Sequence, residues 1–83
     1  MIIERLKNHE SAQAYIIRNG DTIILISYTT EVLIYDVINN TIKCTGLYSN
    51  TTRKHISWFM QQFTNATYYD IKTAYENNEL LQL

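Results

Sequence analysis

The chain has 83 residues, of which 46% are hydrophobic and only 18% charged, which excludes a disordered chain and favours one small globular domain over residues 1–83. Its net charge of −1 provides no overall positive field, so nonspecific binding to nucleic-acid phosphates is disfavoured. The single Cys44 excludes an internal disulfide, and the sequence shows neither a secretory leader nor an apolar run near the roughly 20 residues that span a bilayer. We therefore expect a cytoplasmic protein without membrane contact.

The first part of the chain predicts two strands and a hairpin. Residues 1–7 fit either one helical turn or a short edge strand, and the sequence leaves these alternatives open. Residues 12–18 read AQAYIIR and are followed by Asn19-Gly20, the pair that is typical of a type I′ hairpin turn. Residues 22–36, TIILISYTTEVLIYD, contain no Gly, Pro or Asn, so we expect one long strand, bent or bulged near its middle, whose halves pair with different neighbours.

The middle of the chain predicts a turn, a strand and the main helix. Residues 37–41 form an asparagine-rich turn, and residues 41–48 run back as a strand. A helix over Asn50–Phe63 follows, with Ser49 or Asn50 as its N-terminal cap. Four apolar residues at helical spacing predict the side that packs on the sheet: Ile56, Phe59, Met60 and Phe63.

The end of the chain predicts a second, short helix. Thr67 and Asp70 have the spacing of a capping box, and Ile71, Ala74 and Tyr75 continue at helical spacing. A strand over residues 66–71 remains an alternative, because Tyr68-Tyr69 favours sheets. Together these elements predict an α+β fold, in which a small antiparallel sheet of three to four strands carries one main helix on a face and a short C-terminal helix.

The only residue that suggests catalysis is His55, which lies beside hydroxyl groups and has the spacing of a helical neighbour to Thr52. No nucleophile-elbow or glycine-rich turn accompanies it, so a histidine held by hydrogen bonds between helix and sheet is the favoured interpretation. His9, His55 and Cys44 match no zinc spacing. We expect no catalytic residues, no metal and no cofactor, and hence a protein that is not an enzyme.

Two motifs carry a resemblance to a known family. Ser27 to Val32 fit SYxTxV, and Tyr48 to Phe59 fit YSxTTxxHIxxF. These motifs resemble a family of small uncharacterised proteins encoded by phages and plasmids of Gram-positive bacteria. The resemblance implies a mobile genetic element and attaches no activity. It also suggests a polar network between strand and helix, which would be a ligand pocket if it were open and concave. The network comprises Tyr28, Thr30, Ser49, Thr52 and His55.

From this setting we expect an accessory protein that binds a host protein. The most concrete form of this function is inhibition of a host defence effector, as by an anti-CRISPR protein. The alternative is a small nucleic-acid-binding regulator that uses Arg53, Lys54 and Trp58. An open sheet edge also predicts a homodimer. Aromatic and basic residues dominate binding hot spots, and the expected partner-binding residues are Arg53, Lys54, Trp58, Tyr68 and Tyr69.

Overall fold

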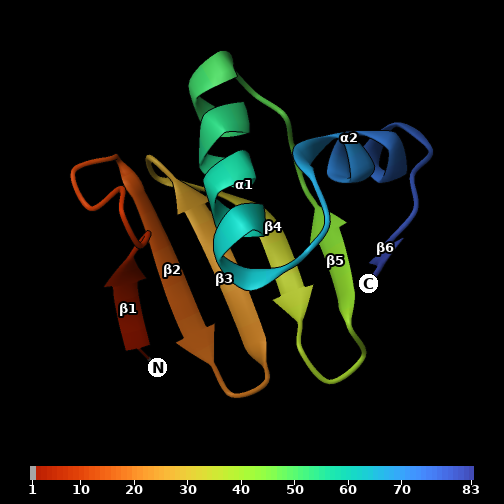
Figure 1. Cartoon of the computed structure of the whole chain (residues 1–83), viewed down its shortest axis with the longest axis horizontal. Helices are drawn as coiled ribbons and strands as arrows, with labels where there is room; N and C mark the ends of the chain where they lie inside the picture. The colour runs from red at the N-terminus through yellow and green to blue at the C-terminus, as the bar shows by residue number, and fades with distance from the viewer. Residues whose placement is uncertain (1) are drawn as a thin grey trace.

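The computed structural model, which describes residues 2–83, is an antiparallel meander of six strands with two helices (Figure 1). The α+β class is confirmed, but the sheet has six strands, not three to four. The additional strands arise because the long apolar segment folds on itself and because both ends of the chain join the sheet. The strands are β1 (Ile2–Arg5), β2 (Ala14–Asn19), β3 (Thr22–Ser27), β4 (Thr30–Asp36), β5 (Thr41–Cys44) and β6 (Leu81–Gln82).

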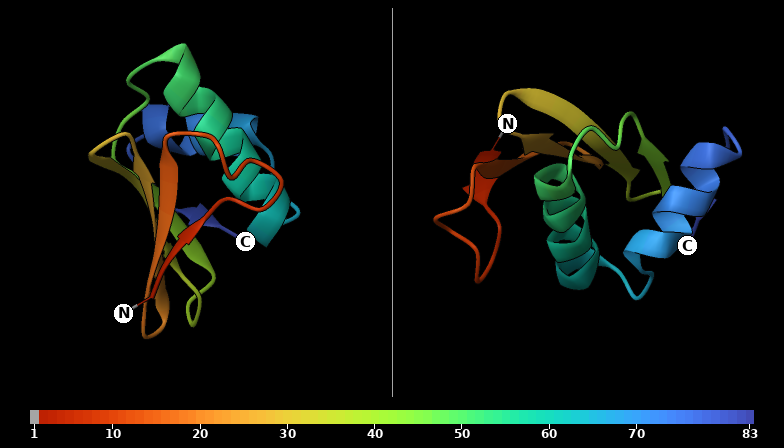
Figure 2. Two further views of the ribbon diagram at one scale, coloured as in Figure 1. Left: turned by 90° about the vertical axis from the view of Figure 1, so that its left-hand side faces the viewer. Right: turned by 90° about the horizontal axis from the view of Figure 1, so that it is seen from above.

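Both helices lie on one side of the sheet, which curves around the longer helix (Figure 2). This helix, α1 (Asn50–Phe63), has the predicted bounds, and Ser49 is its cap because its Oγ accepts the Thr52 N–H. The second helix, α2 (Tyr68–Glu76), begins at the predicted capping box, in which Thr67 and Asp70 exchange hydrogen bonds. The alternative of a strand over these residues is therefore wrong.

The turn between β2 and β3 differs from the predicted one. Asn19 pairs with Thr22 across the hairpin, so the two central residues are Gly20 and Asp21, not Asn19 and Gly20. Gly20 has φ +63°, a left-handed conformation that costs glycine no steric energy. The position of the turn follows from Gly20, because glycine adopts a positive φ without steric cost.

The segment over residues 22–36 is not one long strand. Ser27 pairs with Thr30, and the chain reverses at Tyr28-Thr29 with Tyr28 at φ +59°. The two halves therefore pair with each other, whereas we expected them to pair with different neighbours. A register shift near Ile26 leaves Val32 without a partner opposite it, as in a β-bulge. The sequence carries no glycine or asparagine at this turn, which is why propensity alone does not reveal it.

The core lies between the inner side of the sheet and the two helices. Side chains alternate along β3, so that Ile23, Leu25 and Ser27 are buried beneath α1 while Ile24 and Ile26 lie on the opposite side. Buried apolar residues of both helices and four strands meet here: Ala14, Ile16, Ile23, Leu25, Val32, Leu33, Ile42, Ile56, Phe59, Met60 and Ile71, together with Leu6 from the first loop.

The two ends of the chain form the edges of the sheet. Residues 2–5 form an edge strand, which settles the open alternative for the described part of residues 1–7; Met1 lies outside the described residues. At the other edge β6 pairs with β5 through Leu81 and Ile42. Among residues 2–83, neither helix is long and apolar enough to cross a membrane.

Candidate functional site

A cluster of four polar side chains joins the start of α1 to the end of β3, and we call it the polar latch: Ser27, Ser49, Thr52 and His55. Ser27 Oγ lies 2.8 Å from His55 Nδ1 and 3.1 Å from Thr52 Oγ1. The Ser49 hydroxyl donates to Thr52 Oγ1 at 3.2 Å. Ser27, Thr52 and His55 are each no more than 3% exposed, so the latch is closed to solvent over most of its length.

The hydrogen bonds of the latch have one consistent direction. Ser49 donates to Thr52, which leaves the Thr52 hydroxyl able to donate to Ser27, and the Ser27 hydroxyl able to donate to His55 Nδ1 when that nitrogen carries no proton. This direction requires a neutral imidazole with its proton on Nε2. Burial lowers the pKa of His55 and so favours the same neutral form. The latch is thus a hydrogen-bonded chain that ends on an uncharged histidine.

Local structure explains why these four residues meet. Ser27 is the last residue of β3 and shares the inner side of that strand with Leu25. Thr52 and His55 are three residues apart on α1 and therefore lie on the same side of the helix, facing the sheet. Ser49 precedes them as the helix cap. Strand alternation and helical spacing thus bring together residues that are 25 and 28 positions apart in the chain.

Sequence reasoning placed Tyr28 and Thr30 opposite the helix but overlooked Ser27. In the structure, Thr30 is exposed, and Tyr28 meets His55 only through its ring, with centroids 5.7 Å apart. The difference follows from the turn at Tyr28-Thr29, which carries Tyr28 out of the strand and leaves Thr30 exposed as the first residue of β4. Strand alternation could have identified Ser27, since it lies on the same side as Ile23 and Leu25.

An aromatic stack continues from the latch toward the surface. The centroids of the Trp58 and His55 rings lie 5.7 Å apart. The other aromatic neighbour of Trp58 is His9, in the β1–β2 loop. His9 and Trp58 are nearly parallel, at 7°, with centroids 3.8 Å apart. His9 therefore covers a face of Trp58 and ties the β1–β2 loop to α1.

The outward side of α1 is flanked by two hollows. The first has a volume of about 260 Å³ and is lined by residues of the β1–β2 loop and α1, namely Lys7, Asn8, His9, Trp58, Gln61 and Gln62. The second, also about 260 Å³, lies between α1 and α2 and is lined by Ser57, Met60, Gln61, Ala66, Thr67, Tyr68 and Tyr69. Gln61 borders both hollows, so the exposed turn of α1 around it separates them.

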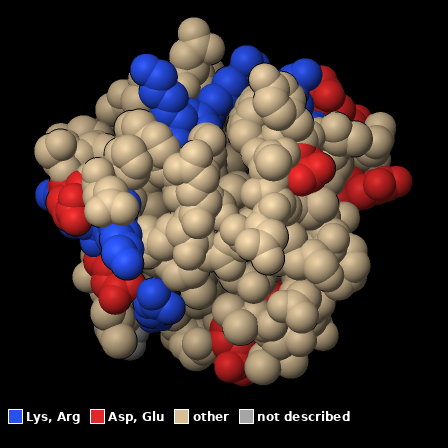
Figure 3. Space-filling model, in the orientation of Figure 1, with Lys and Arg blue, Asp and Glu red and all other residues tan. Residues whose placement is uncertain are grey.

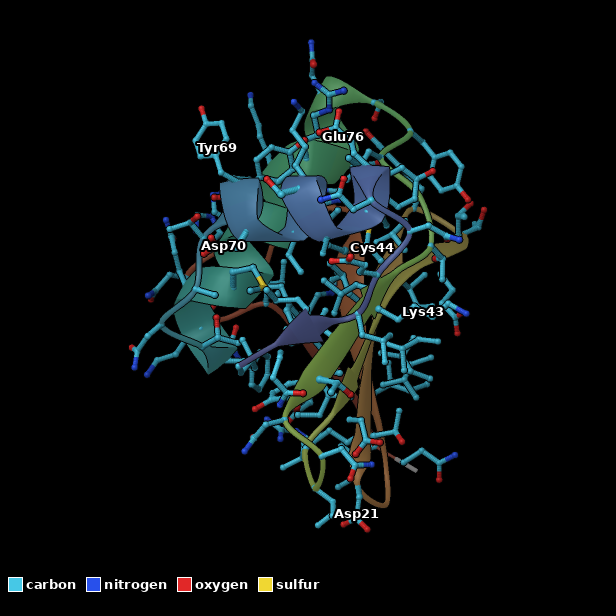
Figure 4. The ribbon with its side chains drawn as sticks, turned by 90° about the vertical axis from the view of Figure 1, so that its right-hand side faces the viewer. Asp21, Lys43, Cys44, Tyr69, Asp70 and Glu76 are labelled. Carbon is cyan, nitrogen blue, oxygen red and sulfur yellow. The ribbon has the colours of Figure 1, made fainter. Side chains whose placement is uncertain are left out.

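The residues expected to bind a partner are distributed around this side of α1. Arg53 and Lys54 are exposed at the beginning of the helix, where cationic side chains gather at the top of the molecule (Figure 3). Trp58 is half-buried and borders the first hollow. Tyr68 is also half-buried, whereas Tyr69 is 75% exposed and projects from α2 into solvent (Figure 4). The structure therefore does not bring all five into one patch.

Ser27 and His55 have the spacing of a nucleophile and its base, but both are only 2% exposed, which leaves a substrate no access to either atom. Within residues 2–83, no three His, Cys, Asp or Glu side chains lie close enough to hold a metal ion. Cys44 lies half-buried beside α2, where burial raises the pKa of its thiol and makes it a poor nucleophile. The latch is thus suited to fixing α1 on the sheet.

These features define a small α+β protein whose main helix is fixed by a buried polar latch and exposes its opposite side. The chain belongs to a family of unknown function (DUF8033), whose model matches residues 1–77. No curated protein and no solved structure matches it at a significant level.

Proposed function

We propose that this protein is a nonenzymatic accessory protein of a phage or another mobile element, and that it binds a host protein through the outward side of α1 and the start of α2. The observation that carries the proposal is the exposed Tyr69 beside a hollow at the junction of the two helices. A tyrosine that is 75% exposed contributes nothing to the core, and tyrosine is enriched among residues that dominate binding energy.

The two hollows beside Gln61 support a protein partner. Each has a volume of about 260 Å³, which suits one or two inserted side chains better than a substrate-sized ligand. Their lining residues are uncharged apart from Lys7, and the exposed cations Arg53 and Lys54 lie at the start of α1. An uncharged centre with charge at its rim is the usual anatomy of a protein interface.

The most concrete form of this function is inhibition of a host defence effector, such as a CRISPR nuclease. This form rests on the resemblance of the SYxTxV and YSxTTxxHIxxF motifs to small phage and plasmid proteins. An inhibitor of this kind needs a rigid binding surface and no chemistry of its own. The buried latch, which fixes α1 on the sheet, supplies the rigidity.

A nucleic-acid-binding regulator is supported less well. Base stacking on Trp58 would require His9 to leave the ring it covers at 3.8 Å. Arg53 and Lys54 are only two cations, whereas nucleic-acid grooves carry more. Binding to single-stranded DNA or RNA that weakens steeply with rising salt would favour this alternative over the proposal.

Affinity capture tests the proposal directly. The tagged chain is incubated with lysate from a Gram-positive bacterium, and the recovered proteins are compared among the wild type, Tyr69→Ala and Ile38→Ala. Ile38 is 68% exposed in the β4–β5 turn, far from α1 in Figure 1, and serves as the matched control. We expect one protein that Ile38→Ala retains and Tyr69→Ala loses, with unchanged thermal unfolding of both variants. Recovery of no specific protein, or equal recovery by both variants, would contradict the proposal.

A cleavage assay tests the anti-defence form separately. A purified RNA-guided nuclease from the same host is assayed with and without an excess of the chain. We expect inhibition by the wild type and by Ile38→Ala, and its loss in Tyr69→Ala. If the nuclease cleaves fully although the chain still captures another host protein, the proposed inhibition of a defence nuclease is wrong. The proposed binding of a host protein would then still stand.

A further inference from the structure

The side of the sheet opposite the helices is covered by no element of the described chain (Figure 2). Strand pairing arranges its central side chains in two rows. The first row crosses β1 to β4 through direct partners and consists of Ile3, Ile17, Ile24 and Ile34, and the exposed Lys43 of β5 follows it. The second row lies beside it and consists of Arg5, Tyr15, Ile26 and Glu31. We call these eight residues the outer face.

The outer face is unusually apolar for a sheet surface in contact with water. In an antiparallel sheet with one solvent-exposed side, each strand normally alternates apolar and polar residues. Continuous apolar runs are typical of strands that are buried on both sides. The run Ile23–Ile26 in β3 is a continuous apolar run of this type, although only Ile23 and Leu25 of its residues lie in the core. Ile3 is 64% exposed, and the isoleucines at 17, 24, 26 and 34 retain part of their surface. The pattern predicts a second covering layer.

The two rows are complementary to themselves. A twofold axis parallel to the strands, between β2 and β3, reverses the strand order of one copy against the other, so that β1 faces β4 and β2 faces β3. In the first row every isoleucine then meets an isoleucine. In the second row Tyr15 meets Ile26, and Arg5 meets Glu31 at both ends of the contact, in addition to the bonds that Arg5 Nη1 donates to the carbonyl oxygens of Glu10 and Ala12. Opposite charges at the ends and apolar groups between them fit a second copy of this chain.

The edge of the sheet offers a poorer contact for a second copy. On β1, Glu4 forms an ion pair with Arg18 at 2.6 Å, and a charge of this kind on an edge strand hinders pairing with another strand. At the opposite edge β6 has only two residues. The edge-to-edge dimer expected from the sequence is therefore less favourable than contact through the outer face.

We propose that the outer face is a homodimer interface in which two sheets pack face to face about this twofold axis. The two rows cover on the order of 260 Å² per copy, from strand and residue spacings alone, and this side of the sheet is convex because the sheet curves around α1. A standard stable interface buries about 800 Å² per partner, so the dimer is weak and forms only at high protein concentration. The dimer leaves α1 and α2 of both copies on its two outward sides.

Sedimentation velocity at protein concentrations up to about 1 mM tests the interface, since a weak dimer assembles only at high concentration. We expect the wild type to shift from monomer to dimer, and Ile24→Lys to remain a monomer throughout, because a lysine at the centre of the face loses its water on association. Ile38→Lys, in the β4–β5 turn outside the face, should dimerise as the wild type does. Circular dichroism establishes that each variant is folded. A wild type that stays monomeric, or an Ile24→Lys variant that dimerises normally, would overturn the proposal.

A charge exchange tests the orientation of the two copies. Glu31→Lys and Arg5→Glu each place like charges opposite one another, so each alone should raise the Kd about tenfold. In an equimolar mixture, Arg5 of one variant meets Glu31 of the other, and Lys at 31 meets Glu at 5. The mixture should therefore dimerise more tightly than either variant alone. No gain on mixing two folded variants would exclude this twofold arrangement.

Discussion

Ser27 Oγ and His55 Nδ1 lie 2.8 Å apart, and both residues are only 2% exposed. In an open cleft, a serine and a histidine at this distance would suggest a nucleophile and its base. Here the pair lies under α1 and continues through Thr52 to the helix cap Ser49. Burial turns an arrangement typical of catalysis into one that sets the position of a helix on a sheet.

Removal of the Ser27 hydroxyl should destabilise the fold. In Ser27→Ala, His55 Nδ1 and the Thr52 hydroxyl lose a partner inside the protein, and the free energy of unfolding should fall by about 1–3 kcal/mol. Urea denaturation followed by circular dichroism measures the change. Ser57→Ala is the matched control, because Ser57 lies on the opposite side of α1 and should change stability by less than about 0.5 kcal/mol. Equal losses in both variants would show that the latch contributes nothing specific.

Stability should fall on mild acidification because of His55. Burial lowers the pKa of His55 below its ordinary value of 6.5, so the unfolded chain binds this proton more readily than the folded chain. The stabilisation is fully present above pH 6.5 and is lost as the pH falls through the lower pKa of the folded state. Unfolding free energies of the wild type and His55→Gln between about pH 7.5 and 5 isolate the effect. We expect the wild type to lose more stability, and parallel curves would be inconsistent with a buried neutral His55.

The cap of α1 should contribute independently of the apolar contacts beneath the helix. Ser49→Ala removes the acceptor of the Thr52 N–H, which should lower the free energy of unfolding by about 1 kcal/mol. Ser49→Asp restores an acceptor and adds a negative charge to a first turn that has no acidic residue. Thermal unfolding should therefore rank the wild type and Ser49→Asp together above Ser49→Ala. A less stable Ser49→Asp would indicate that the hydroxyl bond to Thr52 outweighs capping.

Trp58 is the single tryptophan, so its fluorescence reports on the stack with His9. His9→Ala removes the ring that lies 3.8 Å from Trp58 and opens that side of the indole to water. The emission maximum should move to longer wavelength while circular dichroism stays unchanged. His9→Phe keeps an aromatic ring in place and should leave the emission near that of the wild type. Identical spectra for all three proteins would mean that the stack is not formed in solution.

Much of the fold could be predicted where a residue pattern is compatible with only one local structure. The bounds of α1 follow from an apolar side at helical spacing and a serine at the position where the first-turn amides need an acceptor. The capping box of Thr67 and Asp70 identified the start of α2 against the sheet preference of its two tyrosines. Local hydrogen bonds that satisfy helix ends are visible in sequence because they join residues three positions apart.

The strand topology could not be predicted to the same extent. The hairpin at Tyr28-Thr29 places a bulky residue at positive φ, a conformation that sequence propensity assigns to glycine or asparagine. Because the sequence does not reveal this turn, β3 and β4 were predicted as one strand. Thr30 was therefore assigned to the latch in place of Ser27. The latch itself depends on long-range packing, which fixes the strand residue that lies under the helix. Helical spacing alone placed Thr52 and His55 on the buried side of α1.

The latch fixes α1 on the sheet only if Ser27 and His55 stabilise the fold together. A double-mutant cycle of Ser27→Ala, His55→Ala and the double variant, measured by urea denaturation, tests this claim directly. We predict a coupling free energy of about 1 kcal/mol or more, because either single substitution already breaks the same hydrogen bond. Additive losses, with a coupling near zero, would contradict the latch and would return the Ser27–His55 pair to consideration as a site with another role.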